Sequence, residues 1–273
     1  MFPSFLLSLR EGLEVALILG IVLGTLRKLN RANDAKVVWF GASSAILLSL
    51  FFAVILHWLG ASLEGFIEEI YEGTMMFMAA GVLTWVIFWM QRQSRSLRSQ
   101  IEADVRQTSQ KGGRQALFTL AFLMVLREGA ELAIFLTTTA ITSGAQSVLL
   151  GAVLGLGTAI FLGWSLFTNL IRLNVKRFFQ ITSVLLLFFA AGLVAQGIHE
   201  FNEIGWIPAL VEHVWNINPW LDEESVLGQM LKALFGYNGN PSLSEVLGYL
   251  LYWGGMFWGI RWVFLSSAAP QRA

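Results

Sequence analysis

Two short segments of the sequence place two carboxylates and one guanidinium at identical spacing. Both have the pattern Arg-Glu-Gly-x-Glu, and they comprise Arg10, Glu11, Gly12 and Glu14 in the first copy and Arg127, Glu128, Gly129 and Glu131 in the second. Residues three or four apart share one face of a helix. Each copy would therefore present two neighbouring carboxylates, with its arginine within reach of the second. Paired carboxylates of this kind are ligands for hard metal ions.

Both copies lie inside long apolar segments, where charged groups are expensive. Six unpaired charges at the centres of membrane helices would cost on the order of 15–20 kcal/mol. The four carboxylates and two guanidinium groups together carry a net charge of −2, which a divalent cation would neutralise. Oxygen ligands suit Fe(III), Mn(II), Mg(II) and Ca(II), and they accept Fe(II). The structural alternative is that the Arg–Glu pairs lock helices together, but two such pairs would need only two acids.

Two further groups of residues are weaker candidates for metal binding. Glu69 and Glu72 form a carboxylate pair at the outer end of the third apolar segment, where they could accept a cation from outside. Alternatively, they only favour the positive end of a helix dipole. His199, Glu200 and Glu203 could capture metal at the outer end of the sixth segment, although a solvated turn is the alternative.

The composition indicates a membrane protein and excludes several kinds of site. Of the 273 residues, 56% are hydrophobic and 13% are charged, whereas a soluble domain carries about a quarter charged residues. The chain has no cysteine, which excludes disulfides, thiolate zinc sites and Cys-ligated iron–sulfur clusters. The net charge is zero, so no basic surface points to nucleic acid. The N-terminus lacks the features of a cleavable signal, and we expect its apolar segment to be retained as a span.

Seven segments are long and apolar enough to cross a bilayer as helices, which takes about 20 residues each. The first and fourth, which contain the two motifs, qualify only if buried charge is tolerated. The predicted spans are Pro3–Leu26, Val37–Leu59, Ile70–Met90, Gln115–Thr142, Val148–Ile171, Phe178–Gly197 and Leu243–Leu265.

The distribution of basic residues predicts the orientation of these spans. Fifteen of the 18 Lys and Arg residues fall on one side of a seven-span arrangement, and the other side holds only Lys232. Cytoplasmic loops are enriched in Lys and Arg. The C-terminus is therefore predicted to be cytoplasmic and the N-terminus to lie outside. The outer side carries acids instead, which would raise the local concentration of cations.

The chain also contains an internal repeat. Phe5–Ala16 reads FLLSLREGLEVA and Phe122–Ala133 reads FLMVLREGAELA, which agree at eight of twelve positions. Each repeat has three spans, an odd number, so the repeats would lie in opposite orientations. We predict one all-α polytopic membrane domain over residues 1–273, with repeats at about 3–90 and 115–197, an outer loop at about 198–242 and a seventh helix at about 243–265. Inverted repeats are typical of transporters, whose substrate site lies near the midplane.

With these motifs the sequence resembles the Ftr-type, oxidase-dependent iron permeases, and within them the bacterial EfeU-like branch. The resemblance rests on the two REGxE motifs, the acidic pair before Gly73, and three stretches: TWVIFWM (Thr84–Met90), FFAAGL in the sixth span and FGYxxxPSxSEV (Phe235–Val246). It covers nearly the whole chain. It implies a high-affinity iron importer in the bacterial inner membrane and no enzymatic activity. It also implies iron ligation by the motif glutamates, namely Glu11, Glu14, Glu128 and Glu131, and by Glu69 and Glu72, with Arg10 and Arg127 at the motif's arginine positions.

The resemblance further implies that iron is the transported substrate and that no cofactor is permanently bound. It implies separate periplasmic partners, a cupredoxin-like protein and a haem peroxidase, which would oxidise or deliver iron. Two alternatives stay open. One is transport of another divalent metal such as Mn(II), or of a proton-coupled solute. The other is a membrane di-iron enzyme, but helical di-iron sites typically use Glu-x-x-His rather than the Glu-x-x-Glu found here.

Overall fold

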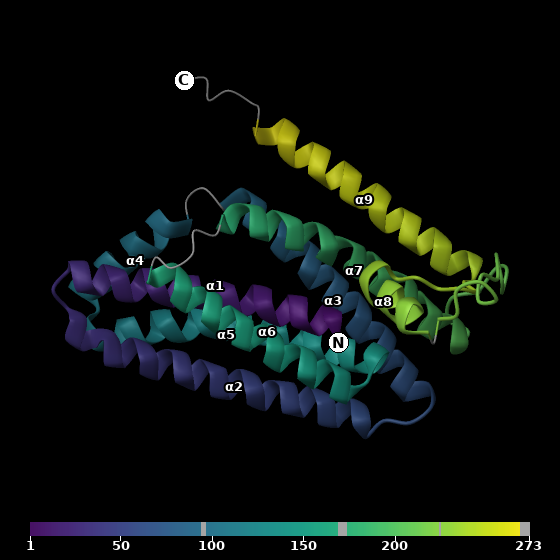
Figure 1. The fold of residues 1–273 in the computed structure, drawn as a ribbon, viewed down its shortest axis with the longest axis horizontal. Helices are drawn as coiled ribbons and strands as arrows, with labels where there is room; N and C mark the ends of the chain where they lie inside the picture. Colours follow the sequence, from purple (N-terminus) through teal and green to yellow (C-terminus); the bar gives the residue numbers. More distant parts are fainter. Residues whose placement is uncertain (94–96, 169–173, 224, 268–273) are drawn as a thin grey trace. The chain divides into compact units, whose positions relative to one another are not determined.

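The computed structural model describes residues 1–93, 97–168, 174–223 and 225–267 (Figure 1). These residues form helices joined by turns and contain no strand, which confirms the all-α prediction for this part of the chain. The helices are α1 (Phe2–Lys28), η1 (Ala32–Asp34), α2 (Ala35–Ala61), α3 (Phe66–Gln93), α4 (Leu97–Lys111), α5 (Gly113–Ser143), α6 (Ala145–Phe167), α7 (Val175–Glu203), α8 (Val226–Phe235) and α9 (Leu243–Ser267).

Within the residues that the structure describes, four helical segments are long and apolar enough to cross a membrane by length and composition. They are Ala32–Ala61, Phe66–Met90, Ala145–Phe167 and Val175–Glu203, which correspond to η1 with α2, to α3, to α6 and to α7. The helices α1 and α5 are long enough, but each contains the three charged residues of its motif. The helix α9 is 25 residues long and rich in Tyr, Trp and Gly, which lowers its mean hydropathy. The count of seven spans therefore stays a prediction.

Two helices lie outside the predicted spans. The 15-residue α4 follows α3 and is too short to cross a bilayer. The helix α8 lies within the predicted outer loop, and α7 continues to Glu203 at the beginning of that loop. Ile171, the predicted end of the fifth span, lies outside the described residues, as do Arg95, Arg172 and Arg272 of the predicted cytoplasmic side.

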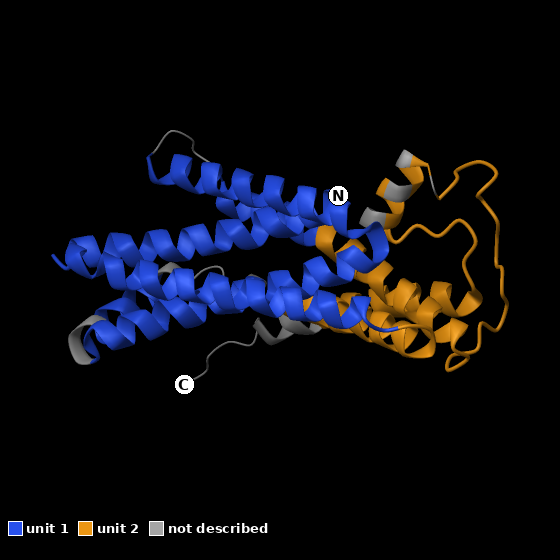
Figure 2. Cartoon of the chain, turned by 90° about the horizontal axis from the view of Figure 1, so that it is seen from below, with its two compact units in different colours: residues 1–63, 90–184 blue, residues 64–89, 185–273 orange. Residues whose placement is uncertain are grey.

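The chain forms two compact units that cut across the sequence repeats (Figure 2). Unit 1 comprises residues 1–63 and 90–184, and therefore contains α1, α2, α4, α5 and α6. Unit 2 comprises residues 64–89 and 185–273, and contains most of α3 and α7 together with α8 and α9. Each unit thus takes equivalent helices from both predicted repeats.

In unit 1, α1 packs along α6 and α2 packs along α5. Glycines make both contacts close. A Cβ on Gly151 of α6 would collide with Ser4 and with the backbone of Met1 and Phe5, and a Cβ on Gly12 of α1 would lie 2.7 Å from the Cβ of Ala159. Gly151 thus contacts the first residues of α1, and Ala159, further along α6, contacts Gly12, further along α1. The two helices are therefore parallel.

The contact between α2 and α5 repeats this pattern. A Cβ on Gly41 would lie 2.7 Å from the carbonyl oxygen of Phe118 and 3.3 Å from the amide nitrogen of Phe122. Phe122 occupies the position of Phe5 in the repeated segment. Gly41 therefore packs against Phe122 of α5 as Gly151 packs against Phe5 of α1. The two helix pairs therefore use equivalent residues. Further along both helices Gly129 of α5 lies against Ser49 of α2, so α2 runs parallel to α5.

The α1–α6 contact gives a prediction about folding. An alanine at Gly155 would place its Cβ 2.5 Å from the carbonyl oxygen of Phe5 and 3.0 Å from the amide nitrogen of Leu9, so the helices would have to separate. We expect Gly155→Ala to lower the melting temperature and the yield of folded protein. The matched control is Gly157→Ala in the same helix, where a Cβ meets no atom within 4 Å. Equal melting temperatures in detergent for the two variants would contradict the close packing of α1 on α6.

Unit 2 is held together by aromatic and glycine contacts between α3, α7 and α9. The rings of Phe77 and Phe201 stack at 5.6 Å between their centroids, and Gly73 of α3 faces Phe201 of α7. The hydroxyls of Thr84 and Tyr252 lie 2.8 Å apart and join α3 to α9. The helix α8 is followed by its C-cap residue Gly236, whose backbone lies against Gly192 of α7. A Cβ on either glycine would collide with the other.

Candidate metal centre

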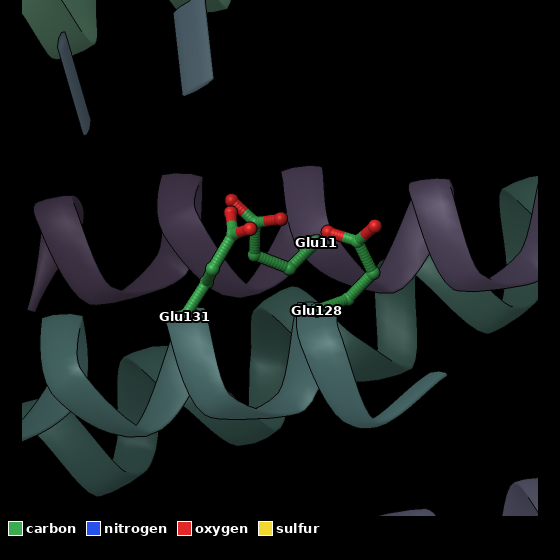
Figure 3. A group of neighbouring side chains, drawn as sticks. All are labelled: Glu11, Glu128 and Glu131. Carbon is green, nitrogen blue, oxygen red and sulfur yellow. The ribbon is translucent and has the colours of Figure 1, made fainter. Parts of the chain in front are cut away.

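The helices α1 and α5 of unit 1 bring the two motifs together. One carboxylate oxygen each of Glu11, Glu128 and Glu131 lies within 4.8 Å of the other two (Figure 3). All three residues are buried, with 1%, 3% and 6% of their surface exposed. No other group of His, Asp and Glu in the described part of the chain has this spacing. We call these residues the three-glutamate group.

Arg10 links the first motif into a buried network. Its guanidinium is fully buried, with Nη1 2.8 Å from Oε1 of Glu11 and Nη2 3.0 Å from Oε1 of Glu14. Nη2 also donates a hydrogen bond of 3.0 Å to the sulfur of Met90, a contact that the sequence motif did not indicate. One fork-shaped cation thus holds both carboxylates of its own motif, which a compact ammonium could not do with the same geometry.

Arg127 makes the equivalent pairs in the second motif but is less buried. Its Nε lies 3.0 Å from Oε1 of Glu131 and 3.7 Å from Oε1 of Glu128. The side chain of Arg127 is 32% exposed, against 0% for Arg10. The two motifs are therefore identical in sequence pattern but differ in environment, and solvent screens the charge of Arg127 more strongly.

The three-glutamate group keeps ligand capacity that the protein does not use. The Oε2 atoms of Glu11, Glu128 and Glu131 are buried and accept no hydrogen bond from the protein. Buried polar atoms normally have partners, and leaving a charged one without is unfavourable. Three buried carboxylates that converge, each with one oxygen free of hydrogen bonds, suit a hard cation, which would also offset the local excess of negative charge.

Glu14 occupies a different place. It is 9% exposed, pairs with Arg10, and is not a member of the three-glutamate group. The structure therefore brings together three of the four carboxylates that the motifs contain. Ligation of iron by these residues stays a prediction.

The other predicted site residues belong to unit 2. Glu69 and Glu72 lie on the first turns of α3 and are half-buried. Gly73, next to Glu72, faces Glu200 of α7, and Glu72 interacts electrostatically with Glu203. The predicted acidic pair therefore has the acids of α7 as neighbours.

His199 is tied to a carboxylate that the sequence reasoning did not single out. Its Nδ1 lies 3.1 Å from Oε1 of Glu245, and its Nε2 lies 3.4 Å from Oε1 of Glu203. The buried Glu245 also accepts a hydrogen bond of 2.6 Å from Asn238. The sequence pattern that could have identified Glu245 is Ser242-x-x-Glu245, which is typical of a capping box. At the start of α9 the backbone amide of each of these two residues donates a hydrogen bond to the side chain of the other.

Comparisons with known proteins bear on the whole chain. The model of the iron permease FTR1 family matches residues 1–269. Ferrous iron permease EfeU of Escherichia coli O157:H7 is 36% identical over 254 residues, which cover 92% of this chain and 92% of the relative. Ferrous iron permease EfeU of Yersinia pestis is 32% identical over 254 residues, which cover 92% and 90%. No solved structure matches the chain significantly.

These matches confirm the resemblance found in the sequence. The family and the relatives are permeases, which indicates a transporter and not an enzyme, as predicted. The long apolar helices agree with a membrane protein. From residue 1 to residue 269, this chain belongs to the FTR1 family of iron permeases.

Proposed function

We propose that this protein imports Fe(II) across the bacterial inner membrane and that the three-glutamate group binds the ion near the midplane. The observation that carries this proposal is the convergence of three buried carboxylates, each with an oxygen that accepts no hydrogen bond. The relatives named above are ferrous iron permeases. A divalent ion also balances the net charge of −2 that the two motifs carry together.

The packing of unit 1 supports the seven-span topology on which this proposal depends. If α1, α2, α3, α5 and α6 each cross the membrane and α4 does not, then α1 and α6 cross in the same direction, as do α2 and α5. Both pairs pack in parallel. Omitting α5 from the spans, or adding α4, would make α1 and α6 antiparallel.

The same contacts support an inverted repeat. In both helix pairs, the first helix of one repeat packs on the second helix of the other, through equivalent residues. In transporters built this way the substrate site lies where the repeats meet. The three-glutamate group takes its members from the first helix of each repeat.

We propose the following path for the ion. The acids of the outer side gather the cation, and Glu69 and Glu72 accept it, with His199, Glu200 and Glu203 nearby on α7. Glu14 would act after the three-glutamate group, because it lies one turn further along α1. An inside-negative potential favours inward movement by about 2.3 kcal/mol per charge per 100 mV. No resident cofactor takes part, and cupredoxin-like and haem peroxidase partners would handle iron in the periplasm.

Reconstitution into liposomes tests the function directly. We expect radioactive iron to enter protein-containing vesicles under an inside-negative potential, faster as Fe(II) with ascorbate than as Fe(III) citrate. Vesicles without protein provide the baseline. Uptake no faster than this baseline with both forms of iron would refute iron transport.

Competition between metals separates iron from the alternative substrates. Oxygen ligands bind Mn(II) as well as Fe(II), but Mn(II) stands lower in the general order of affinities. We therefore expect Mn(II) to inhibit Fe(II) uptake only when it is in excess. If Mn(II) were taken up in preference to Fe(II), the protein would be a manganese transporter.

A further inference from the structure

A surface cavity of about 440 Å³ lies between the beginnings of α2 and α5 in unit 1. It is lined by Val37 of α2 and by Arg114, Gln115, Phe118 and Thr119 of α5. None of these residues belongs to the ion site described above. The volume falls in the range of cavities that bind small molecules.

Arg114 gives this cavity a positively charged group of fixed orientation. Its Nε lies 3.1 Å from Oδ1 of the buried Asp34, whose Oδ2 lies 2.6 Å from Nη2 of Arg31. The pair with Asp34 involves only Nε, and the side chain of Arg114 is 74% exposed. Its two terminal nitrogens can therefore bind a phosphate side by side, the geometry that a guanidinium offers to this anion.

The surroundings of Arg114 also favour an anion. Arg31, Arg114 and the exposed Lys36 are three cations against the single carboxylate of Asp34, which leaves a net charge of +2. The helix α5 begins at Gly113, and no side chain caps its first turn. The positive end of the helix dipole adds to the charge of these side chains. The ligand of this cavity should therefore be negatively charged.

The aromatic side chains at the cavity indicate a lipid rather than free phosphate. Phe118 lies one turn further along α5 than Arg114, and its ring lies 5.8 Å from the ring of Phe40, which is 68% exposed. On its other side Phe118 stacks on Phe122 at 5.8 Å. An acyl chain would cover this apolar surface, whereas a free phosphate would gain nothing from it.

The cavity lies at the depth where phospholipids carry their phosphates. Val37 and Gln115 are the first residues of the predicted second and fourth spans, and both lie at the predicted cytoplasmic side. At the ends of membrane spans the hydrocarbon core gives way to the headgroups. Basic pockets between membrane helices on the cytoplasmic side are suited to anionic headgroups.

We propose that this cavity binds an anionic phospholipid of the cytoplasmic leaflet. Arg114 and Gln115 hold the phosphate, and an acyl chain lies along Phe118 and Phe40. Asp34 is a positioning residue, because it orients the guanidinium of Arg114. The bound lipid fills the space between α2 and α5 and stabilises their contact. The proposal goes beyond the proposed function, since it does not depend on which ion is transported.

Melting temperatures in detergent test this proposal, with dioleoylphosphatidylglycerol as the probe. Dioleoylphosphatidylcholine has the same chains without a net charge, and glycerol 3-phosphate has the phosphate without the chains. We expect a saturable rise in melting temperature with phosphatidylglycerol only, since a ligand that binds the folded state stabilises it. An equal rise with phosphatidylcholine, or with glycerol 3-phosphate, would overturn the assignment to an anionic lipid.

Three variants locate the site. Arg114→Gln removes the charge from the cavity. Gln115→Glu adds a negative charge there but keeps the pair of Arg114 with Asp34, so it decides the question if Arg114→Gln folds poorly. We expect each to raise the half-saturating concentration of phosphatidylglycerol about tenfold, the effect of losing one charge-assisted hydrogen bond.

The matched control is Arg106→Gln, which removes the same charge from an exposed position of α4 on the predicted cytoplasmic side. It should bind phosphatidylglycerol like the wild type. The proposal is overturned if Arg114→Gln and Gln115→Glu keep the half-saturating concentration of the wild type. It is also overturned if Arg106→Gln weakens binding as much as they do, because binding would then follow the overall charge and not the cavity.

Discussion

Replacement of Glu11, Glu128 or Glu131 by glutamine should abolish Fe(II) uptake while the protein remains folded in the membrane. Glutamine keeps the size of the side chain and removes the charge. Mutating residues that only support metal ligands typically costs 10–100-fold in affinity, so loss of a direct ligand should reduce uptake by roughly 100-fold or more. Uptake into liposomes and the melting temperature in detergent would be measured on the same preparations.

The control for these variants is Glu212→Gln. Glu212 is exposed and lies in the predicted outer loop, outside all described helices. It should transport like the wild type. Glu14→Gln is informative as well, because Glu14 pairs with Arg10 but is not part of the three-glutamate group. We expect it to slow transport with a smaller effect on iron binding. Wild-type uptake by all three of the glutamine variants at positions 11, 128 and 131 would mean that the group has only a structural role.

Arg10→Gln should destabilise the protein far more than Arg127→Gln, although the two arginines occupy the same position in the motif. Arg10 is fully buried and holds both Glu11 and Glu14, whereas the side chain of Arg127 is 32% exposed. Removing one partner of a buried ion pair costs about 3–5 kcal/mol, because the other charge stays buried without compensation. For a protein of this size such a loss lowers the melting temperature by roughly 10 °C. Arg127→Gln should lower the stability less, since the arginine in that pair is partly exposed and solvent screens its charge.

Thermal unfolding of the two variants in the same detergent checks this difference. Arg10→Lys adds a control for charge alone, because lysine keeps the positive charge but not the planar fork that reaches two carboxylates. We expect it to recover only part of the lost stability. Equal melting temperatures for Arg10→Gln and Arg127→Gln would contradict the difference in burial between the two motifs.

Most of the chemistry could be predicted from the sequence because it depends on local spacing. The positions of Arg10, Glu11 and Glu14 on one helix follow from 3.6 residues per turn, and so does the Arg10–Glu14 pair, found at 3.0 Å. The helices that contain the spans follow from hydropathy, and α5 ends within one residue of the predicted span. The repeat of Phe5–Ala16 at Phe122–Ala133 needed only a comparison of the chain with itself.

Contacts between distant segments could not be predicted in the same way. The sequence pattern gives no reason to distinguish Glu11, Glu14, Glu128 and Glu131 as ligands. In the structure, three of these carboxylates have an oxygen within 4.8 Å of the other two, whereas Glu14 pairs with Arg10. The local pattern of His199 suggested metal capture, whereas Glu245, 46 residues later, holds its Nδ1. A single sequence without structure does not say which of several faces of two helices will meet.

The sequence by itself determined the six charged groups of the two motifs, their net charge of −2, and membership of an iron permease family. These three properties are local or additive, and none of them depends on how the helices are arranged. Only the tertiary structure decided that α1 packs on α6 and α2 on α5, and that Arg10 is buried while Arg127 is partly exposed. The physical reason is that glycines far along the chain from the residues they contact, such as Gly41 against Phe118 and Gly12 against Ala159, set how closely the helices approach. The separation of the helices then fixes which side chains meet.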